Sequence, residues 1–166
     1  MTILQVPDHV REFFVEAGWF PGRSVAVPIS VPNSHPAAKI WAAFGGLRVG
    51  SVRPVIGTSA SDIQFSWYGD ESHDQRIWSG LLATKLIYAG SCHNAHGAIF
   101  IASDGRWFHQ SDISDSFWFV ADTWEEALSN ILLGIKQDQP MLRRGQESVW
   151  SYGDEIFADD PRLYHY

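Results

Sequence analysis

Apolar residues recur at the three-to-four-residue spacing of a helix in four segments of the chain, at residues 7–17, 34–44, 72–82 and 123–133. Each segment begins at a residue suited to a helix start. Pro7 suits a first turn, and Ser34 can cap the second segment with its side-chain oxygen. Ser72 and Thr123 each precede a Gln or Glu by three residues, which is the spacing of a capping box. The sequence therefore predicts four helices.

Shorter apolar runs between these helices predict β-strands, at residues 47–49, 62–67, 85–89, 98–102, 106–109 and 117–120. In the second run Ile63, Phe65 and Trp67 alternate with polar residues, as in a strand with one buried face. Asp104-Gly105 predicts a tight turn between two of the runs. Beyond Lys136 the periodicity fades, and we expect the tail to pack as loops.

Strands and helices alternate irregularly, with no internal repeat and no linker composition. This order favours an α+β fold, with helices packed against a mixed or antiparallel sheet, over a regular βαβ repeat. A length of 166 residues suits one domain. We expect residues 1–136 to form this domain and the acidic, aromatic-containing extension at residues 137–166 to pack on it.

Charge is distributed unevenly along the chain. The net charge is −7, but residues 1–57 sum to +2 and residues 58–166 to −9. An acidic surface repels phosphate backbones and anionic membranes and speeds association with a basic protein. We therefore expect a protein partner, no direct nucleic-acid binding and no membrane binding. The alternative, which stays open, is that the acidic charge serves only solubility and indicates no partner.

The chain has no basic-then-apolar leader, no apolar run near the roughly 20 residues of a membrane span, and a single cysteine, Cys92. A single cysteine cannot form an intramolecular disulfide. These features predict a cytoplasmic protein.

Four ordered motifs carry a family resemblance. They are Glu16-Ala17-Gly18-Trp19-Phe20-Pro21-Gly22-Arg23, Phe44-Gly45-Gly46-Leu47, Asp104-Gly105-Arg106, and Glu125-Glu126-Ala127-Leu128 continuing to Gly134. Together they resemble the third subgroup of the SUKH superfamily of immunity proteins, over roughly residues 8–136. Residues 51–61 and the loop from Cys92 to His96 depart from that pattern.

This resemblance implies an α+β fold and an antitoxin role in bacterial polymorphic toxin systems. The implied partner is a cognate toxin, and the family's usual nucleic-acid-targeting toxins tend to be basic, which fits the acidic skew. The implied action is to block the toxin's active site, without catalysis and without a cofactor. A related scaffold that binds a non-toxin cellular protein is the alternative.

The motif residues are types that serve a fold, namely Gly18, Trp19, Gly22, Arg23, Phe44, Gly45, Gly46, Asp104, Gly105 and Gly134. Glycine suits turns and helix ends, because it reaches positive φ without steric cost. We expect Trp19 and Phe44 to fill the core beside them, and Arg23 to bridge carbonyls at a helix end or pair with an acid. Recognition should then lie on residues outside the motifs.

Two segments place acids beside aromatic residues, a composition suited to an interface that steers by charge and anchors by a buried ring. The candidate partner-binding residues are Trp67, Tyr68, Asp70, Glu71 and Asp74 in one segment, and Asp112, Asp115 and Trp118 in the other. Solvated loop acids beside core aromatics are the alternative for either segment. The acidic tail, at residues 154–155 and 159–160, is a third candidate.

Cys92, His93, His96 and His109 are the residue types that bind zinc, but their spacing fits no recognised site. We expect a polar loop around a half-buried cysteine and no metal. A nucleophilic Cys–His pair is also disfavoured, because adjacent residues on a strand point to opposite faces. Glu125 and Glu126 fit a helix start better than an acid–base pair.

Overall fold

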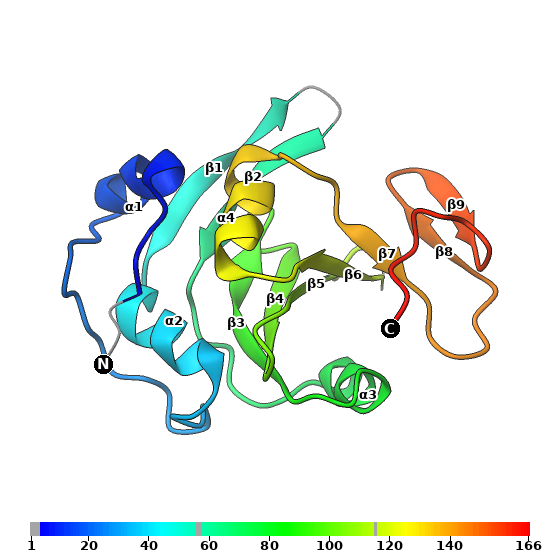
Figure 1. The fold of residues 1–166 in the computed structure, drawn as a ribbon, viewed down its shortest axis with the longest axis horizontal. Helices are drawn as coiled ribbons and strands as arrows, with labels where there is room; N and C mark the ends of the chain where they lie inside the picture. Colours follow the sequence, from blue (N-terminus) through cyan, green and yellow to red (C-terminus); the bar gives the residue numbers. More distant parts are fainter. Residues whose placement is uncertain (1–3, 56–57, 115) are drawn as a thin grey trace.

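A seven-stranded antiparallel sheet forms the centre of the molecule in the computed structural model, which describes residues 4–55, 58–114 and 116–166 (Figure 1). Each strand pairs with its neighbour in sequence, so the order is β1-β2-β3-β4-β5-β6-β7. The strands are β1 (Arg48–Val55), β2 (Thr58–Gln64), β3 (Leu86–Cys92), β4 (Gly97–Ala102), β5 (Trp107–Ser111), β6 (Phe117–Ala121) and β7 (Gln139–Met141). A separate hairpin joins β8 (Ser148–Ser151) to β9 (Asp154–Phe157). The predicted α+β class is confirmed.

Helices cover both faces of this sheet. The helices are η1 (Asp8–Val10), α1 (Arg11–Glu16), α2 (Pro36–Phe44), α3 (His73–Leu81) and α4 (Trp124–Leu133). Side chains of α1, α2 and α4 share one hydrophobic cluster with the sheet, and we call that side the α4 face. Side chains of α3 share a second cluster on the other side, which we call the α3 face.

Strand β4 shows why helices must cover both faces of the sheet. Ile99 and Ile101 belong to the cluster of the α4 face, whereas Phe100 and Ala102 belong to that of the α3 face. Successive side chains of a strand point to opposite sides, so a strand that is apolar at every position must be buried on both. On the α3 face, Trp78 of α3 covers the sheet by stacking on Phe117 with ring centroids 4.5 Å apart.

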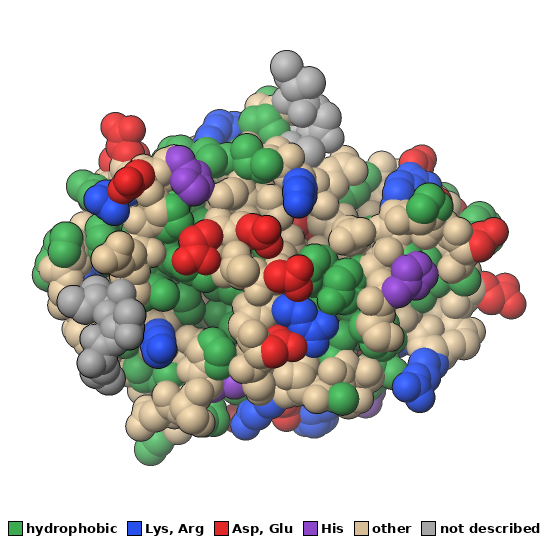
Figure 2. Space-filling view, viewed as in Figure 1, with side chains coloured by type: hydrophobic (Ala, Val, Ile, Leu, Met, Phe, Trp, Pro, Cys, Tyr) green, Lys and Arg blue, Asp and Glu red, His purple; other side chains and the backbone are tan. Residues whose placement is uncertain are grey.

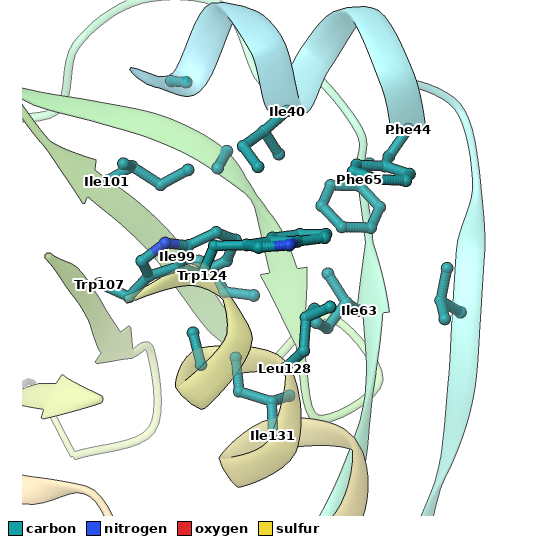
Figure 3. Close-up of a cluster of buried hydrophobic side chains, with 14 of the residues drawn as sticks. Ile40, Phe44, Ile63, Phe65, Ile99, Ile101, Trp107, Trp124, Leu128 and Ile131 are labelled. Carbon is teal, nitrogen blue, oxygen red and sulfur yellow. The ribbon is translucent and has the colours of Figure 1, made fainter. Parts of the chain in front are cut away.

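Aromatic rings pack among aliphatic side chains in the core of the α4 face (Figure 3). Phe44, at the end of α2, stacks on Trp124 of α4 at 5.0 Å and contacts Phe65 at 5.4 Å. The indole of Trp124 also donates a hydrogen bond to the carbonyl of Gln5. The N-terminus, α2 and α4 are therefore tied together through this one group of rings.

The second motif of the family resemblance ends α2 at this core. Arg23 donates to the carbonyls of Ala43 and Gly45, both at 2.8 Å, which is the bridging contact that the sequence suggested. A Cβ on Gly45 would lie 2.8 Å from the carbonyl oxygen of Trp41, so this position needs a glycine for space. Gly46 has open space around it but a φ of 85°, so it needs a glycine for conformation.

Several boundaries differ from the predicted ones. The strand predicted at 47–49 continues to Val55, and its partner begins at Thr58 and ends at Gln64 rather than at residue 67. Pairing passes through an irregularity after Gly50, beyond which β1 is mostly exposed, so no apolar alternation marked it. Helix α2 is capped by His35 instead of Ser34, because its Nδ1 accepts from the N–H of Ala37.

The capping box of α3 is present as predicted, with Ser72 and Gln75 each accepting from the other's backbone N–H. For α4 the hydroxyl of Thr123 accepts from the N–H of Glu126. The tail contains strands β7, β8 and β9, so the expectation of loops was wrong there. The strands have three or four residues each, too short for periodicity to reveal them.

Candidate functional site

A cavity of about 500 Å³ opens on the α3 face of the sheet. Its floor comes from the strands β3, β4 and β5, through side chains such as Tyr88, Phe100 and Gln110. One wall is the segment that leads into α3, and another is the turn after β5, which carries Asp112. The two acid-and-aromatic segments singled out in the sequence therefore border one concave surface.

Three carboxylates, those of Asp70, Asp74 and Asp112, line this cavity, and no lysine or arginine is among its described lining residues. Asp74 is engaged within the fold, because it accepts from Gln110 Nε2 at 3.0 Å and pairs with Arg143 at 2.8 Å. Asp112 is 63% exposed, with His96 Nδ1 3.7 Å away. Asp70 is exposed and has no ion-pair partner within residues 4–55, 58–114 and 116–166. Two acids therefore remain open to a partner.

An exposed ring stands at the edge of the cavity. Tyr68 is 73% exposed and lies edge-on to Tyr88, with centroids 6.2 Å apart. Tyr88 is half-buried in the floor, and this burial raises the pKa of its phenol. Trp67 is half-buried and packs on Trp41, so it belongs more to the core than to the surface.

The remaining candidate residues lie elsewhere. Glu71 is exposed but does not line the cavity, and Asp115 falls outside the described residues. Trp118 corrects the expectation of a surface ring, since it is only 5% exposed and faces the opposite side of the sheet. Its indole donates to Ser151 Oγ, and its ring stacks on His109 at 4.5 Å. Alternation along β6 places it there, which a run of three aromatics did not reveal.

A second polar cluster lies on the α4 side, where Cys92, His93 and His109 bring one ligand atom each within 4.8 Å of one another. It is the one such group in the described part of the chain. His96, which the sequence placed beside these residues, lines the cavity of the α3 face instead. Asp138 joins the cluster from the tail, with Oδ2 2.6 Å from His109 Nδ1. Nothing in the sequence spacing indicated Asp138.

Strand β3 ends at Cys92, which explains how two adjacent residues reach one cluster. His93 follows the strand with a φ of 54°, and Asn94 and Ala95 also have positive φ. The expectation that Cys92 and His93 point to opposite faces was therefore wrong, because it assumed continuous strand.

Burial sets the protonation of this cluster. It raises the pKa of the Cys92 thiol well above its ordinary value, and the charges of Asp138 and Asp62 raise it further. Burial also lowers the pKa of His93, as does the nearby His109. At neutral pH the thiol is protonated and His93 is neutral.

The order Asp138–His109–Cys92 is that of a nucleophilic triad, but its surroundings do not suit catalysis. Cys92 is 1% exposed. The open space beside it is about 20 Å³, which is room for about one water molecule. No substrate can reach the sulfur in this arrangement.

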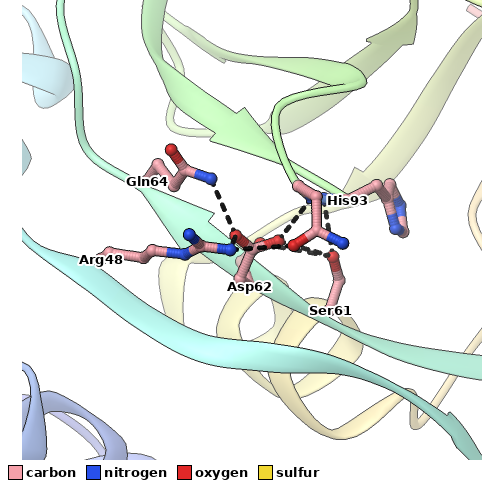
Figure 4. A network of polar contacts seen from close by, with 6 residues as sticks. Arg48, Ser61, Asp62, Gln64 and His93 are labelled. Carbon is pink, nitrogen blue, oxygen red and sulfur yellow. Dashed lines mark hydrogen bonds and ion pairs between the residues drawn. The ribbon is translucent and has the colours of Figure 1, made fainter.

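A buried carboxylate holds the backbone that leads out of the cluster (Figure 4). Asp62, on β2, accepts from the N–H of Asn94 at 2.8 Å and pairs with Arg48 at 3.1 Å. Gln64 donates to Oδ2 of Asp62, the oxygen that also pairs with Arg48, and Ser61 Oγ accepts from the N–H of His93. Burial alone would raise the pKa of Asp62, but these hydrogen bonds and the Arg48 charge outweigh it and lower the pKa.

The outer surface of the α4 face is mixed in charge. Figure 2 shows acidic side chains gathered over the middle of this face, with basic ones among them. Glu125 and Glu126 are exposed there, in the first turn of α4.

No helix in the described ranges is both long enough and apolar enough to cross a membrane.

Comparison with known proteins agrees with the motifs. The sequence matches the model of the SUKH-3 immunity protein family over residues 6–134. No curated protein and no solved structure matches it. Among the described residues, the matched region contains the helices η1 and α1 to α4, the strands β1 to β6 and the cavity on the α3 face. This chain belongs to the SUKH-3 immunity protein family.

Proposed function

We propose that this immunity protein neutralises a basic toxin by receiving a lysine or arginine side chain of that toxin in the cavity of the α3 face. The supporting observation is that acids from two distant segments, Asp70 and Asp112, border one cavity without lysine or arginine in its described lining. Family membership supplies the toxin as partner. The basic character of the toxin rests on charge complementarity.

Charge and shape would contribute separately to such binding. The net charge of −9 over residues 58–166 would draw a basic protein and raise its association rate. Once the side chain is seated, Tyr68 and Tyr88 offer aromatic faces to a guanidinium or ammonium group. Asp74, already paired with Arg143, would hold the wall in place more than attract the partner.

The toxin would be inactivated by occlusion. Enzymes that act on nucleic acids present basic side chains to phosphates. A protein that occupies those side chains with carboxylates excludes the phosphate backbone from the same surface. Neutralisation by this route requires no chemistry from the immunity protein.

The test is binding to the toxin encoded beside the gene. The double variant Asp70→Lys/Asp112→Lys should associate at least about tenfold more slowly than the wild type, because it reverses the two cavity acids that are not paired with a lysine or arginine among the described residues. It should also protect cells from the toxin less well. Stopped-flow mixing of the purified proteins measures the rate.

The matched control is Glu12→Lys/Glu16→Lys, which makes the same change in net charge on exposed positions of α1. It should retain most of the wild-type rate. Equal slowing in the two double variants would show that only net charge matters and would remove the cavity from the proposal. Absence of any complex with the toxin would favour the alternative of a scaffold for another cellular protein.

A further inference from the structure

We propose that Cys92, His93 and His109 bind a zinc ion in the interior of this protein, between the sheet and α4. This site is independent of the toxin-binding cavity, because it lies on the opposite side of the same strands. Nothing in the family match assigns it.

The donor set is the first argument. Zinc would bind Cys92 as a thiolate and release the proton of the thiol to solvent. One thiolate and two imidazoles are ligands that zinc prefers, whereas magnesium and calcium prefer oxygen. Around a tetrahedral zinc, sulfur and nitrogen ligands lie about 3.5 Å apart. The three atoms are already within 4.8 Å, so small side-chain rotations would bring them onto one ion.

The second argument is the orientation of His109. Its Nδ1 lies 2.6 Å from Asp138 Oδ2, and this contact favours the tautomer in which Nδ1 donates to the carboxylate and Nε2 is the nitrogen available to a metal. A histidine that binds a metal through one nitrogen usually donates the other N–H to a carboxylate or carbonyl. The ring is also held in place by Trp118, which stacks on it at an angle of 15°.

The third argument is the space left by Gly97. A Cβ at this position would lie 2.9 Å from Cys92 Sγ and 3.6 Å from His109 Nε2. Any larger residue would thus occupy the region between the two donor atoms. The open volume that Cys92, His93 and His109 line is about 20 Å³, which is room for one body of about the size of a water molecule, such as the ion itself.

The fourth argument is the backbone of His93. Three consecutive non-glycine residues, His93, Asn94 and Ala95, have φ between 54° and 71°. This region is uncommon for such residues, and it persists only where the surroundings enforce it. The hydrogen bonds that the N–H groups of His93 and Asn94 donate to Ser61 and Asp62 enforce it here, and they bring His93 to the same cluster as Cys92.

Metal binding can be measured on the full chain, purified without a histidine tag, stripped with a chelator and titrated with zinc. We expect about one zinc ion per chain. Titration with cobalt should give a thiolate charge-transfer band in the near ultraviolet. Cys92→Ser should remove that band and weaken zinc binding at least about tenfold.

The chain offers a matched control in His96→Ala. His96 lies next to the cluster in sequence but lines the other cavity, so this variant should keep both the stoichiometry and the band. Asp138 is a positioning residue, and Asp138→Asn should keep the band while weakening zinc binding about 10- to 100-fold.

Three results would overturn the proposal. One is less than a tenth of an equivalent of bound zinc. Another is a loss of binding in His96→Ala as large as in Cys92→Ser. If Cys92→Ser does not fold, X-ray absorption of the zinc-loaded wild type decides, and a spectrum without a sulfur neighbour at about 2.3 Å contradicts the site.

Discussion

Adjacent residues of one strand serve different surfaces in this protein. On β5, His109 joins the buried cluster of the α4 side, whereas Gln110 lines the cavity of the α3 face. Strand geometry alone separates them, because successive side chains point to opposite sides. A substitution at one of these positions should therefore affect only one of the two sites.

Asp62 is the residue whose replacement should be most informative for stability. It is fully buried and accepts hydrogen bonds from Asn94 and Gln64. We expect Asp62→Asn to lower the free energy of unfolding by about 2 kcal/mol at neutral pH, since a hydrogen-bonded charge is lost. Urea denaturation measures this change.

The same residue predicts a pH dependence. An unfolded aspartate has a pKa near 3.8, and the folded pKa of Asp62 is lower. Its contribution is thus fully present above 3.8 and is lost as pH falls through the folded pKa. The difference in stability between wild type and Asp62→Asn should shrink in that acidic range.

Asp154→Asn is the control for both measurements. Asp154 pairs with Arg162 at 3.0 Å, nearly the distance of the Asp62–Arg48 pair, but its side chain is 68% exposed. Exposed pairs contribute little to stability. A loss in Asp154→Asn as large as in Asp62→Asn would contradict the role given to burial.

A glycine that follows a helix and a glycine inside one act through different properties. Gly46 ends the α2 motif with a φ of 85°, and Gly80 lies within α3 at an ordinary helical conformation. Neither has an atom within 4 Å of the position that a Cβ would take. The two positions therefore differ in backbone conformation and not in available space.

Alanine at these two positions should have effects of opposite sign. Gly46→Ala should destabilise the protein by about 1 kcal/mol, because a left-handed backbone strains an L-residue. Gly80→Ala should stabilise it by about 0.5–1 kcal/mol, because glycine is a poor helix former. Thermal unfolding distinguishes the two, and a change of the same sign in both would refute this account.

The helices and strands differ in how far the sequence revealed them. The helices α1 to α4 appear where apolar spacing predicted them, although His35 and not Ser34 caps α2, and the central strands also appear where they were predicted. The exposed half of β1 and the short strand β7 were missed, because pairing with a neighbour forms them without an apolar pattern.

Single residues of the candidate sites could be predicted from the sequence, but their arrangement in space could not. The sequence singled out Asp70 and Asp112 by composition, but only the fold shows that they border one cavity. It also grouped His96 with Cys92, which strand alternation separates. Asp138 reaches His109 across 29 residues, a long-range contact that no local pattern encodes.

At the scale of the molecule, we propose that the tail and the family-matched region form one domain. Strand β7 pairs with β6, and Tyr164 stacks on Phe119 at 4.0 Å. Asp74 pairs with Arg143 of the tail, so the wall of the α3-face cavity also depends on this segment.

A chain that ends at residue 136 tests this dependence. It should unfold at a lower temperature than the full chain, because the edge of β6 and apolar surface of the α3 face become exposed. Calorimetry of both chains measures the difference. Tyr164→Ala in the full chain should show a smaller loss in the same direction. An unchanged unfolding temperature for the shortened chain would mean that residues 137–166 are a separate appendage.

The sequential order of the strands has a consequence for how the nascent protein matures. Each strand can find its partner as soon as the next one leaves the ribosome, because no pairing waits for a distant segment. The aromatic core of the α4 face cannot form that early, because Phe44 stacks on Trp124, which is synthesised eighty residues later. The aromatic core of the α4 face can therefore close only after α4 has been synthesised.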